Sequence, residues 1–206
     1  IHHLPHTSPR SQRNLPSTPK RNNLRHTRNQ SNILVETPPR SRKGETTLRI
    51  LITGASSLPG YRTTQELLKQ EHEVIAIHLK NPIPLEHPNL TKIKLDITNQ
   101  VKLQDLILKK KPDIIIHMAA YGDVDGCEKN KAYAWKVNVE PTITIAKTAN
   151  IIKAYVLYLS TDYVFDGTKG LYKENEPPSP INYYGLTKAT AETIIKAVCD
   201  QWSIAR

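Results

Sequence analysis

Residues 48–60, with the sequence LRILITGASSLPG, decide the fold of this chain. The first six are apolar or β-branched apart from one arginine, which is typical of a buried parallel strand. Gly54 and Gly60 then predict a tight turn over residues 54–60, and Leu67 and Leu68 indicate a helix over residues 61–70 behind it. A turn between a strand and a helix N-terminus presents backbone N–H groups and a positive dipole end to a pyrophosphate. We therefore predict a dinucleotide-binding unit here; the alternative is an ordinary strand–helix connection.

Strands and helices alternate through the rest of the chain. Further strands are expected at residues 73–78, 92–95, 112–118 and 154–159, and helices at residues 101–110, 132–152 and 181–201. This alternation predicts an α/β domain over residues 48–206, a Rossmann-type doubly wound parallel sheet with helices on both faces. Residues 203–206 resemble the first residues of a sixth strand. We therefore expect a C-terminally truncated chain whose substrate-binding remainder is missing.

Residues 1–47 differ in composition from the rest. They hold nine Lys and Arg against two acidic residues, and six prolines, whereas the whole chain has a formal charge of +10. Such a segment buries too little apolar surface to offset its ordering entropy, so a disordered basic tail is predicted. A nucleic-acid-binding arm or a transit peptide is the less favoured interpretation, and we do not expect nucleic acid as a partner. Because the only methionine is Met118, one hypothesis is that translation begins at Leu48.

Cysteine content and hydropathy argue against several other classes of protein. Cys127 and Cys199 are too few for a disulfide framework and have no metal-binding spacing. No apolar run approaches the ~20 residues of a membrane-spanning helix, and no secretory leader opens the chain. We therefore expect a cytoplasmic protein with no membrane association. The acids Asp123, Asp125 and Glu128 are interpreted as helix-start residues rather than metal ligands, and no metal is expected.

Tyr184 and Lys188 form a Y-x-x-x-K motif within the last predicted helix. Residues four apart lie on one face of a helix, so the two side chains are neighbours. Free tyrosine has a pKa of about 10, and a nearby ammonium group favours the phenolate. The pair is thus suited to acid–base chemistry near neutral pH.

Four stretches together resemble the dTDP-4-dehydrorhamnose reductase family of the extended short-chain dehydrogenases/reductases. They are the glycine turn, A-A-Y-G-D-V-D-G-C-E at residues 119–128, S-T-D-Y-V-F-D-G at residues 160–167, and the Y-x-x-x-K motif. The resemblance covers residues 48–206. It departs at Ser57, which replaces a glycine, and at His117-Met118, where relatives more often have Asn-Ala. The Ser57 hydroxyl is expected either to bond a phosphate oxygen or to weaken cofactor binding.

The resemblance implies an oxidoreductase that acts on a nucleotide-sugar substrate, as in dTDP-rhamnose biosynthesis. NAD(P)H would deliver hydride to a keto carbon, and Tyr184 would protonate the oxyanion. Lys188 would lower the tyrosine pKa and hold the nicotinamide ribose, and Thr161 would hydrogen-bond the carbonyl oxygen. Asn138 matches an asparagine that helps to position the lysine.

The cofactor is expected to be NADP(H), with NAD(H) possible. An acid at the end of the second strand favours NAD, whereas His78 and Lys80 stand there instead and suit a 2′-phosphate. Asp96 and Ile97 resemble the adenine-contacting pair of the family. The expected cofactor-binding residues are Gly54, Ser57, Leu58, Gly60, His78, Lys80, Asp96, Ile97, Ala119, Ala120, Tyr121, Ser160, Tyr184 and Lys188.

Two other functions remain open from the sequence. One is a non-catalytic NAD(P)-binding regulatory subunit resembling the β subunit of methionine adenosyltransferase. The other is an epimerase or dehydratase of nucleotide sugars. Dehydratases usually place acids beside the catalytic threonine, and Asp162 is the sole candidate. A homodimer is a further possible assembly.

Overall fold

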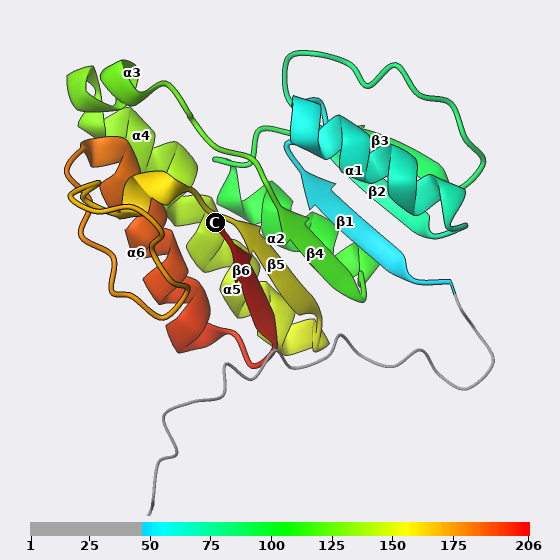
Figure 1. Cartoon of the computed structure of the whole chain (residues 1–206). Helices are drawn as coiled ribbons and strands as arrows, with labels where there is room; N and C mark the ends of the chain where they lie inside the picture. Colours follow the sequence, from blue (N-terminus) through cyan, green and yellow to red (C-terminus); the bar gives the residue numbers. More distant parts are fainter. Residues whose placement is uncertain (1–46) are drawn as a thin grey trace, which may run out of the picture. The chain divides into compact units, whose positions relative to one another are not determined.

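The computed structural model of the protein describes residues 47–206. Its centre is a six-stranded sheet in the order β3-β2-β1-β4-β5-β6, with every neighbouring pair parallel (Figure 1). The strands are β1 (Arg49–Thr53), β2 (Glu73–His78), β3 (Leu90–Lys94), β4 (Ile114–His117), β5 (Tyr155–Leu159) and β6 (Trp202–Ala205). This is the strand order of the Rossmann fold, so the predicted fold class is confirmed.

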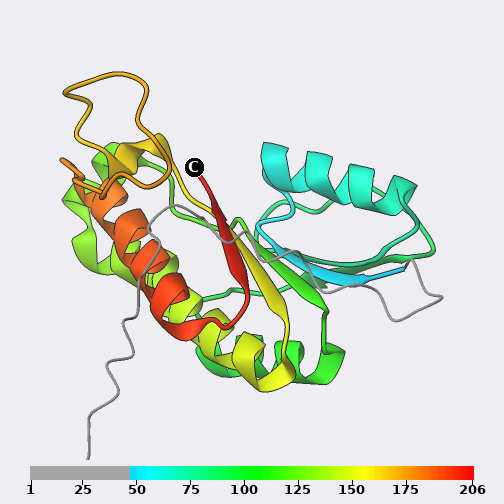
Figure 2. The ribbon, with the colours of Figure 1, turned by 60° about the horizontal axis from the view of Figure 1, so that its bottom comes forward.

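The helices divide between the two faces of the sheet, as Figure 2 shows. They are α1 (Leu58–Lys69), α2 (Gln100–Lys110), α3 (Val124–Lys129), α4 (Lys131–Asn138), α5 (Glu140–Ile152) and α6 (Tyr183–Val198), with a short 3-10 turn η1 (Asp162–Val164). Successive side chains of a strand point to opposite faces. Accordingly Ile50 and Ile52 pack on the α1 side, whereas Leu51 packs in the core that α2, α5 and α6 cover. Each core is a single cluster of buried side chains that includes residues of β1, β2 and β4.

The prediction of one long helix over residues 132–152 was wrong, because this stretch forms two helices, α4 and α5. The chain breaks at Val139, between α4 and α5. Pro141 lies in the first turn of α5 and has no N–H to donate to Val137. Its ring would also collide with that carbonyl in a continuous helix. The proline therefore starts a new helix.

The other elements lie close to their expected positions. The first helix begins three residues earlier than expected, at Leu58, because Ser57 caps it. The acid Asp123 caps α3 by accepting a hydrogen bond from the Gly126 amide, as the helix-start interpretation predicts. The predicted tail, residues 1–47, lies outside the described residues except for Thr47. Among the described helices, none is both long and apolar enough to cross a membrane.

Candidate active site

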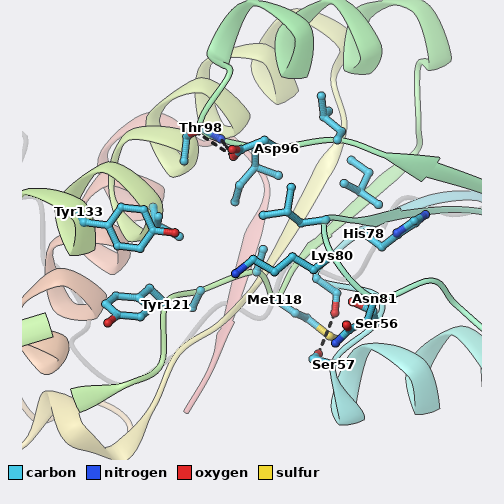
Figure 3. Close-up of a pocket in the computed structure, with 18 residues that line it drawn as sticks. Ser56, Ser57, His78, Lys80, Asn81, Asp96, Thr98, Met118, Tyr121 and Tyr133 are labelled. Carbon is cyan, nitrogen blue, oxygen red and sulfur yellow. Dashed lines mark hydrogen bonds between the residues drawn. The ribbon is translucent and has the colours of Figure 1, made fainter. Parts of the chain in front are cut away.

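A cavity of about 380 Å³ opens at the carboxyl ends of the central strands (Figure 3). Strand order reverses between β1 and β4, so the loops after these two strands run to opposite faces and leave a crevice there. The lining comes from five separate segments: the turn after β1, the ends of β2 and β3, the chain directly after β4, and α4. It includes Gly54, Ser56, Ser57, His78, Lys80, Asn81, Asp96, Ile97, Thr98, Met118, Ala119, Ala120, Tyr121, Tyr133 and Val137.

The turn after β1 requires its two terminal glycines but not a glycine between them. Gly54 has a φ of +70°, and a Cβ there would lie 2.8 Å from the backbone of Ala119. A Cβ on Gly60 would lie 2.3 Å from the Gly54 carbonyl oxygen, because α1 approaches β1 so closely. Ser57 has a φ of −72°, which any residue adopts. Serine is therefore accommodated without backbone strain.

The Ser57 hydroxyl is already engaged within the turn. It donates to the Gly54 carbonyl at 2.8 Å, drawn as a dashed line in Figure 3, and accepts from the Gly60 amide at 3.2 Å. Its proton is thus directed into the turn, towards the Gly54 carbonyl. Leu58 is 75% exposed, and neither it nor Gly60 lines the cavity.

The far end of the cavity carries positive and polar groups. Nδ1 of His78 is buried without a hydrogen-bond partner among the described residues. Figure 3 shows the Lys80 side chain extending over the cavity from the end of β2. Asp96 accepts hydrogen bonds from the amide and hydroxyl of Thr98, at 2.9 and 2.8 Å. Ile97 is buried beneath this turn.

Lys188 is almost completely buried beside β5. Its Nζ donates to the Leu159 carbonyl at 2.6 Å and lies 4.2 Å from the centroid of the Tyr158 ring. Burial lowers the pKa of Lys188 to about 7, an effect that the carboxylate of Glu192 partly opposes. The ammonium group therefore titrates near neutral pH.

Tyr184 lies in the first turn of α6, half-buried, with its ring edge-to-face against Tyr163. Burial raises the pKa of Tyr184, and a hydrogen bond with Thr161 only partly opposes this. The sequence predicted a lowered pKa from Lys188. The structure gives the opposite direction, because burial of Tyr184 is the largest cause of its pKa shift. The geometry does bring Thr161 and Tyr184 together.

Asn138 joins the cavity to α6, the helix that carries Tyr184 and Lys188. Its Oδ1 accepts from the Tyr121 amide at 2.7 Å, and its Nδ2 donates to the Tyr121 carbonyl and to Oγ1 of Thr187. Thr187 in turn donates to the Tyr184 carbonyl. Asn138 thus holds the residue next to Lys188 rather than Lys188 itself.

Glu192 and Arg206 belong to this region and were not expected from the sequence. Glu192 is buried on α6; it accepts from the Ser160 hydroxyl at 2.6 Å and from two nitrogens of Arg206 at 2.9 and 2.7 Å. Burial by itself would raise the pKa of Glu192, but these bonds lower it below its ordinary value. An acid four residues after Lys188, on the face that packs against the sheet, was the signal in the sequence.

The predicted residues therefore form two groups. Nine of the expected cofactor residues line the cavity: Gly54, Ser57, His78, Lys80, Asp96, Ile97, Ala119, Ala120 and Tyr121. Ser160, Thr161, Tyr184 and Lys188 lie outside its lining, at the end of β5 and the start of α6. Asn138 connects the two groups through Tyr121 and Thr187.

Comparisons with known proteins agree with this arrangement. Residues 48–206 match the family model described as the RmlD substrate binding domain. The chain is 36% identical, over 71% of its length and 48% of the relative's, to the probable low-salt glycan biosynthesis reductase Agl14 of Haloferax volcanii. It is 33% identical to methionine adenosyltransferase 2 subunit beta of Bos taurus, over 71% of this chain and 42% of that protein. The chain spans about half the length of the curated relatives it matches.

Solved structures include a similar fold with a cofactor bound. The dTDP-4-dehydrorhamnose reductase of Bacillus anthracis in complex with NADP has a TM-score of 0.67 and 31% identity. The match covers 78% of this chain and 53% of that one.

Proposed function

The chain belongs to the RmlD substrate-binding domain family, and on this premise we propose that it forms the cofactor-binding and catalytic half of an NAD(P)H-dependent reductase. The proposed substrate is a nucleotide-activated sugar with a keto group, as the name of the dTDP-4-dehydrorhamnose reductase relative suggests. The proposed domain comprises residues 48–206. A cytoplasmic location and a homodimer belong to the same proposal.

The observation that carries the proposal is the cavity at the strand reversal. Nine residues selected from four distant stretches of sequence line one space of about 380 Å³. Ser57, the N-cap of α1, lines this space, so the positive end of the helix begins at the cavity. The glycines at positions 54 and 60 bring this helix close against β1. These features fit a dinucleotide laid across the carboxyl ends of the strands.

The residues around Tyr184 suit the proton transfer of such a reduction. A bound nicotinamide cofactor supplies the hydride. The raised pKa of Tyr184 keeps its hydroxyl protonated at neutral pH, so it holds the proton that a new alkoxide needs. Thr161 lies beside this hydroxyl and would orient the carbonyl oxygen. Lys188, with a pKa of about 7, would donate hydrogen bonds to the nicotinamide ribose.

We propose NADP(H) as the preferred cofactor, with NAD(H) as a possible second. The unpartnered Nδ1 of His78 and the ammonium of Lys80 border the same end of the cavity. The end of β2 itself supplies no carboxylate to the lining, and the nearby carboxylate of Asp96 already accepts two hydrogen bonds from Thr98. A 2′-phosphate would satisfy both His78 and Lys80.

A fluorescence titration with NADPH and NADH tests this proposal. We expect tighter binding of NADPH, and Lys80→Ala should weaken NADPH by about tenfold, as for one charge-assisted contact, with NADH unchanged. Lys109→Ala, which removes the same charge at the far end of α2, should change neither. Failure of a folded chain to bind either nucleotide would overturn the proposal. Equal losses for both nucleotides would overturn the NADP preference alone.

A non-catalytic subunit is the second candidate, favoured by the 33% identity to methionine adenosyltransferase 2 subunit beta. Turnover of a dTDP-4-keto-sugar distinguishes the reductase from the non-catalytic subunit. The assay compares the Tyr184→Phe variant with the unchanged protein. A reductase should lose at least about a hundredfold in rate without the tyrosine proton donor. A regulatory subunit would bind cofactor equally well with and without Tyr184 and show no turnover in either form.

A further inference from the structure

A buried chain of hydrogen bonds starts at Thr53, the last residue of β1. Its Oγ1 accepts from two backbone amides, those of Met118 at 3.2 Å and Ala119 at 3.1 Å. The hydroxyl proton is therefore free for a third partner, and this is Nδ1 of His117 at 2.7 Å. Because Thr53 donates to Nδ1, a neutral His117 carries its own proton on Nε2.

The chain continues from His117 to the helices behind the sheet. Nε2 of His117 lies 3.1 Å from Oγ1 of Thr142, which in turn donates to the Asn138 carbonyl at 3.0 Å. From Asn138 the bonds branch to Tyr121 and to Thr187, as described above. Thr53, His117, Thr142, Asn138 and Thr187 are all buried. With the proton of His117 assigned to Nε2, every proton in the series has one acceptor.

The imidazole of His117 is neutral at neutral pH. Burial, and to a smaller extent the nearby charge of Lys188, lowers the pKa of His117 to about 3. The side chain also has the reach that the network needs. An asparagine at position 117 would place one amide atom near Thr53 but would end short of Thr142, because the ring extends beyond the amide. The departure from the Asn-Ala pair of relatives thus creates a connection rather than a defect.

We propose that His117 is a positioning residue that fixes residues 118–121, one wall of the cavity, to both β1 and α6. On one side Thr53 holds the amides of Met118 and Ala119. On the other side Thr142 and Asn138 hold Tyr121 and the helix of Tyr184 and Lys188. The role of residues 118–121 rests on the proposed function, in which this wall of the cavity contacts the nicotinamide cofactor. His117 touches neither the cavity nor the proposed reacting atoms.

Thr142→Val is the sharpest test, because valine keeps the shape and removes the hydroxyl. Thr148→Val is the matched control: Thr148 is also buried on α5, and its hydroxyl donates only to the Thr144 carbonyl one turn back. We expect Thr142→Val to speed amide hydrogen exchange of residues 118–122 by about tenfold in the cofactor-free protein, with little change in the control. Thr142→Ser, which keeps the hydroxyl, should restore slow exchange.

Two further measurements separate a positioning role from a packing role. His117→Asn and Thr142→Val should each raise the Kd for NADPH by about three- to tenfold, and the double variant should be no worse than either alone. The ¹⁵N spectrum of His117 should show the Nε2–H tautomer without titration from pH 5 to pH 9. If Thr142→Val fails to fold, this spectrum of the unchanged protein decides the matter.

Equal exchange in the Thr142→Val and Thr148→Val variants, additive effects on the Kd, or an Nδ1–H tautomer would each overturn the inference. Exchange and tautomer are measured without cofactor. A protein that binds no NAD(P)H would therefore overturn the proposed function, while the exchange result would still decide whether His117 positions the 118–121 wall.

Discussion

At the level of single residues, the burial of Lys188 determines how the candidate site ionises. The side chain is 2% exposed and has one carbonyl and one aromatic face as its partners. In the folded protein its pKa is about 7, against 10.5 in its ordinary environment. Between these values the unfolded chain binds more protons than the folded one, so stability rises with pH across this window. Below pH 7 the buried charge lowers stability by its full amount.

Replacing Lys188 with methionine should therefore stabilise the fold. At pH 6 we expect Lys188→Met to raise the free energy of unfolding by an amount on the order of a few kcal/mol. The gain should shrink as the pH rises from 7 to 10.5, the window set by the two pKa values. Urea unfolding at a series of pH values measures this. Lys147→Met, at an exposed lysine of α5, is the control and should show no such trend. Parallel pH curves for Lys188→Met and the unchanged protein would contradict the prediction.

At the level of elements, α6 begins in a way that orients its first turn. Asn182 caps the helix, since its Oδ1 accepts from the Gly185 amide at 2.7 Å. Gly185 lets the helix approach the segment after β5, because a Cβ there would lie 2.1 Å from the Tyr163 carbonyl oxygen. Tyr184 stands between these two residues. Its position therefore depends on a cap and a close contact as well as on helical spacing.

Two asparagine caps offer a matched comparison. Asn182→Ala and Asn99→Ala each remove one cap, the second from α2, and each should cost about 1 kcal/mol of stability. Only Asn182→Ala should speed hydrogen exchange in residues 183–187, because fraying is confined to the uncapped turn. Exchange mass spectrometry on both variants measures this. Equal exchange of the α6 start in the two variants would show that the cap does not hold Tyr184.

At the scale of the whole described domain, one partly buried ion pair, between Glu192 and Arg206, connects β5, α6 and β6. Glu192 lies on α6, Ser160 follows β5, and Arg206 follows β6. Arg206 also donates to the Glu174 carbonyl and lies over the Phe165 ring. These bonds hold the sheet edge, the helix and the loop before it in one arrangement. Removing the Glu192 carboxylate would leave Ser160 and Arg206 without the acceptor that they share.

Removing one member of this pair should be costly, whereas removing both should not. We expect Glu192→Ala to lower the free energy of unfolding by about 3 kcal/mol, and Glu192→Leu with Arg206→Leu to recover most of it. Lys196→Ala removes only the exposed partner at 3.7 Å and should cost less than about 1 kcal/mol. Thermal and urea unfolding provide these values. A double variant as unstable as Glu192→Ala would contradict the prediction.

The contribution of the Glu192–Arg206 ion pair to the free energy of unfolding depends on pH. The pKa of Glu192 is lowered in the folded protein, from an ordinary value of 4.5. Its contribution is therefore complete above pH 4.5 and is lost as the pH falls through the lowered pKa. The stability difference between Glu192→Ala and the unchanged protein should narrow over that acidic range and stay constant above it.

The sequence by itself determined the fold class, the glycine turn and nine of the residues that line the cavity. These follow from local patterns: the apolar runs of the strands, the glycines at positions 54 and 60, and the strand–helix alternation. Local pattern also contained the break at Pro141, although helical periodicity obscured it in the prediction of one helix over residues 132–152.

Only the tertiary structure decided how the site residues ionise and what holds them. The pKa of Lys188 depends on burial against β5, and the direction of the Tyr184 shift depends on the same burial. The partners of His117 and Glu192 come from segments 14 to 64 residues away along the chain. Desolvation and long-range hydrogen bonding arise from packing between distant segments, and no local sequence pattern encodes either one.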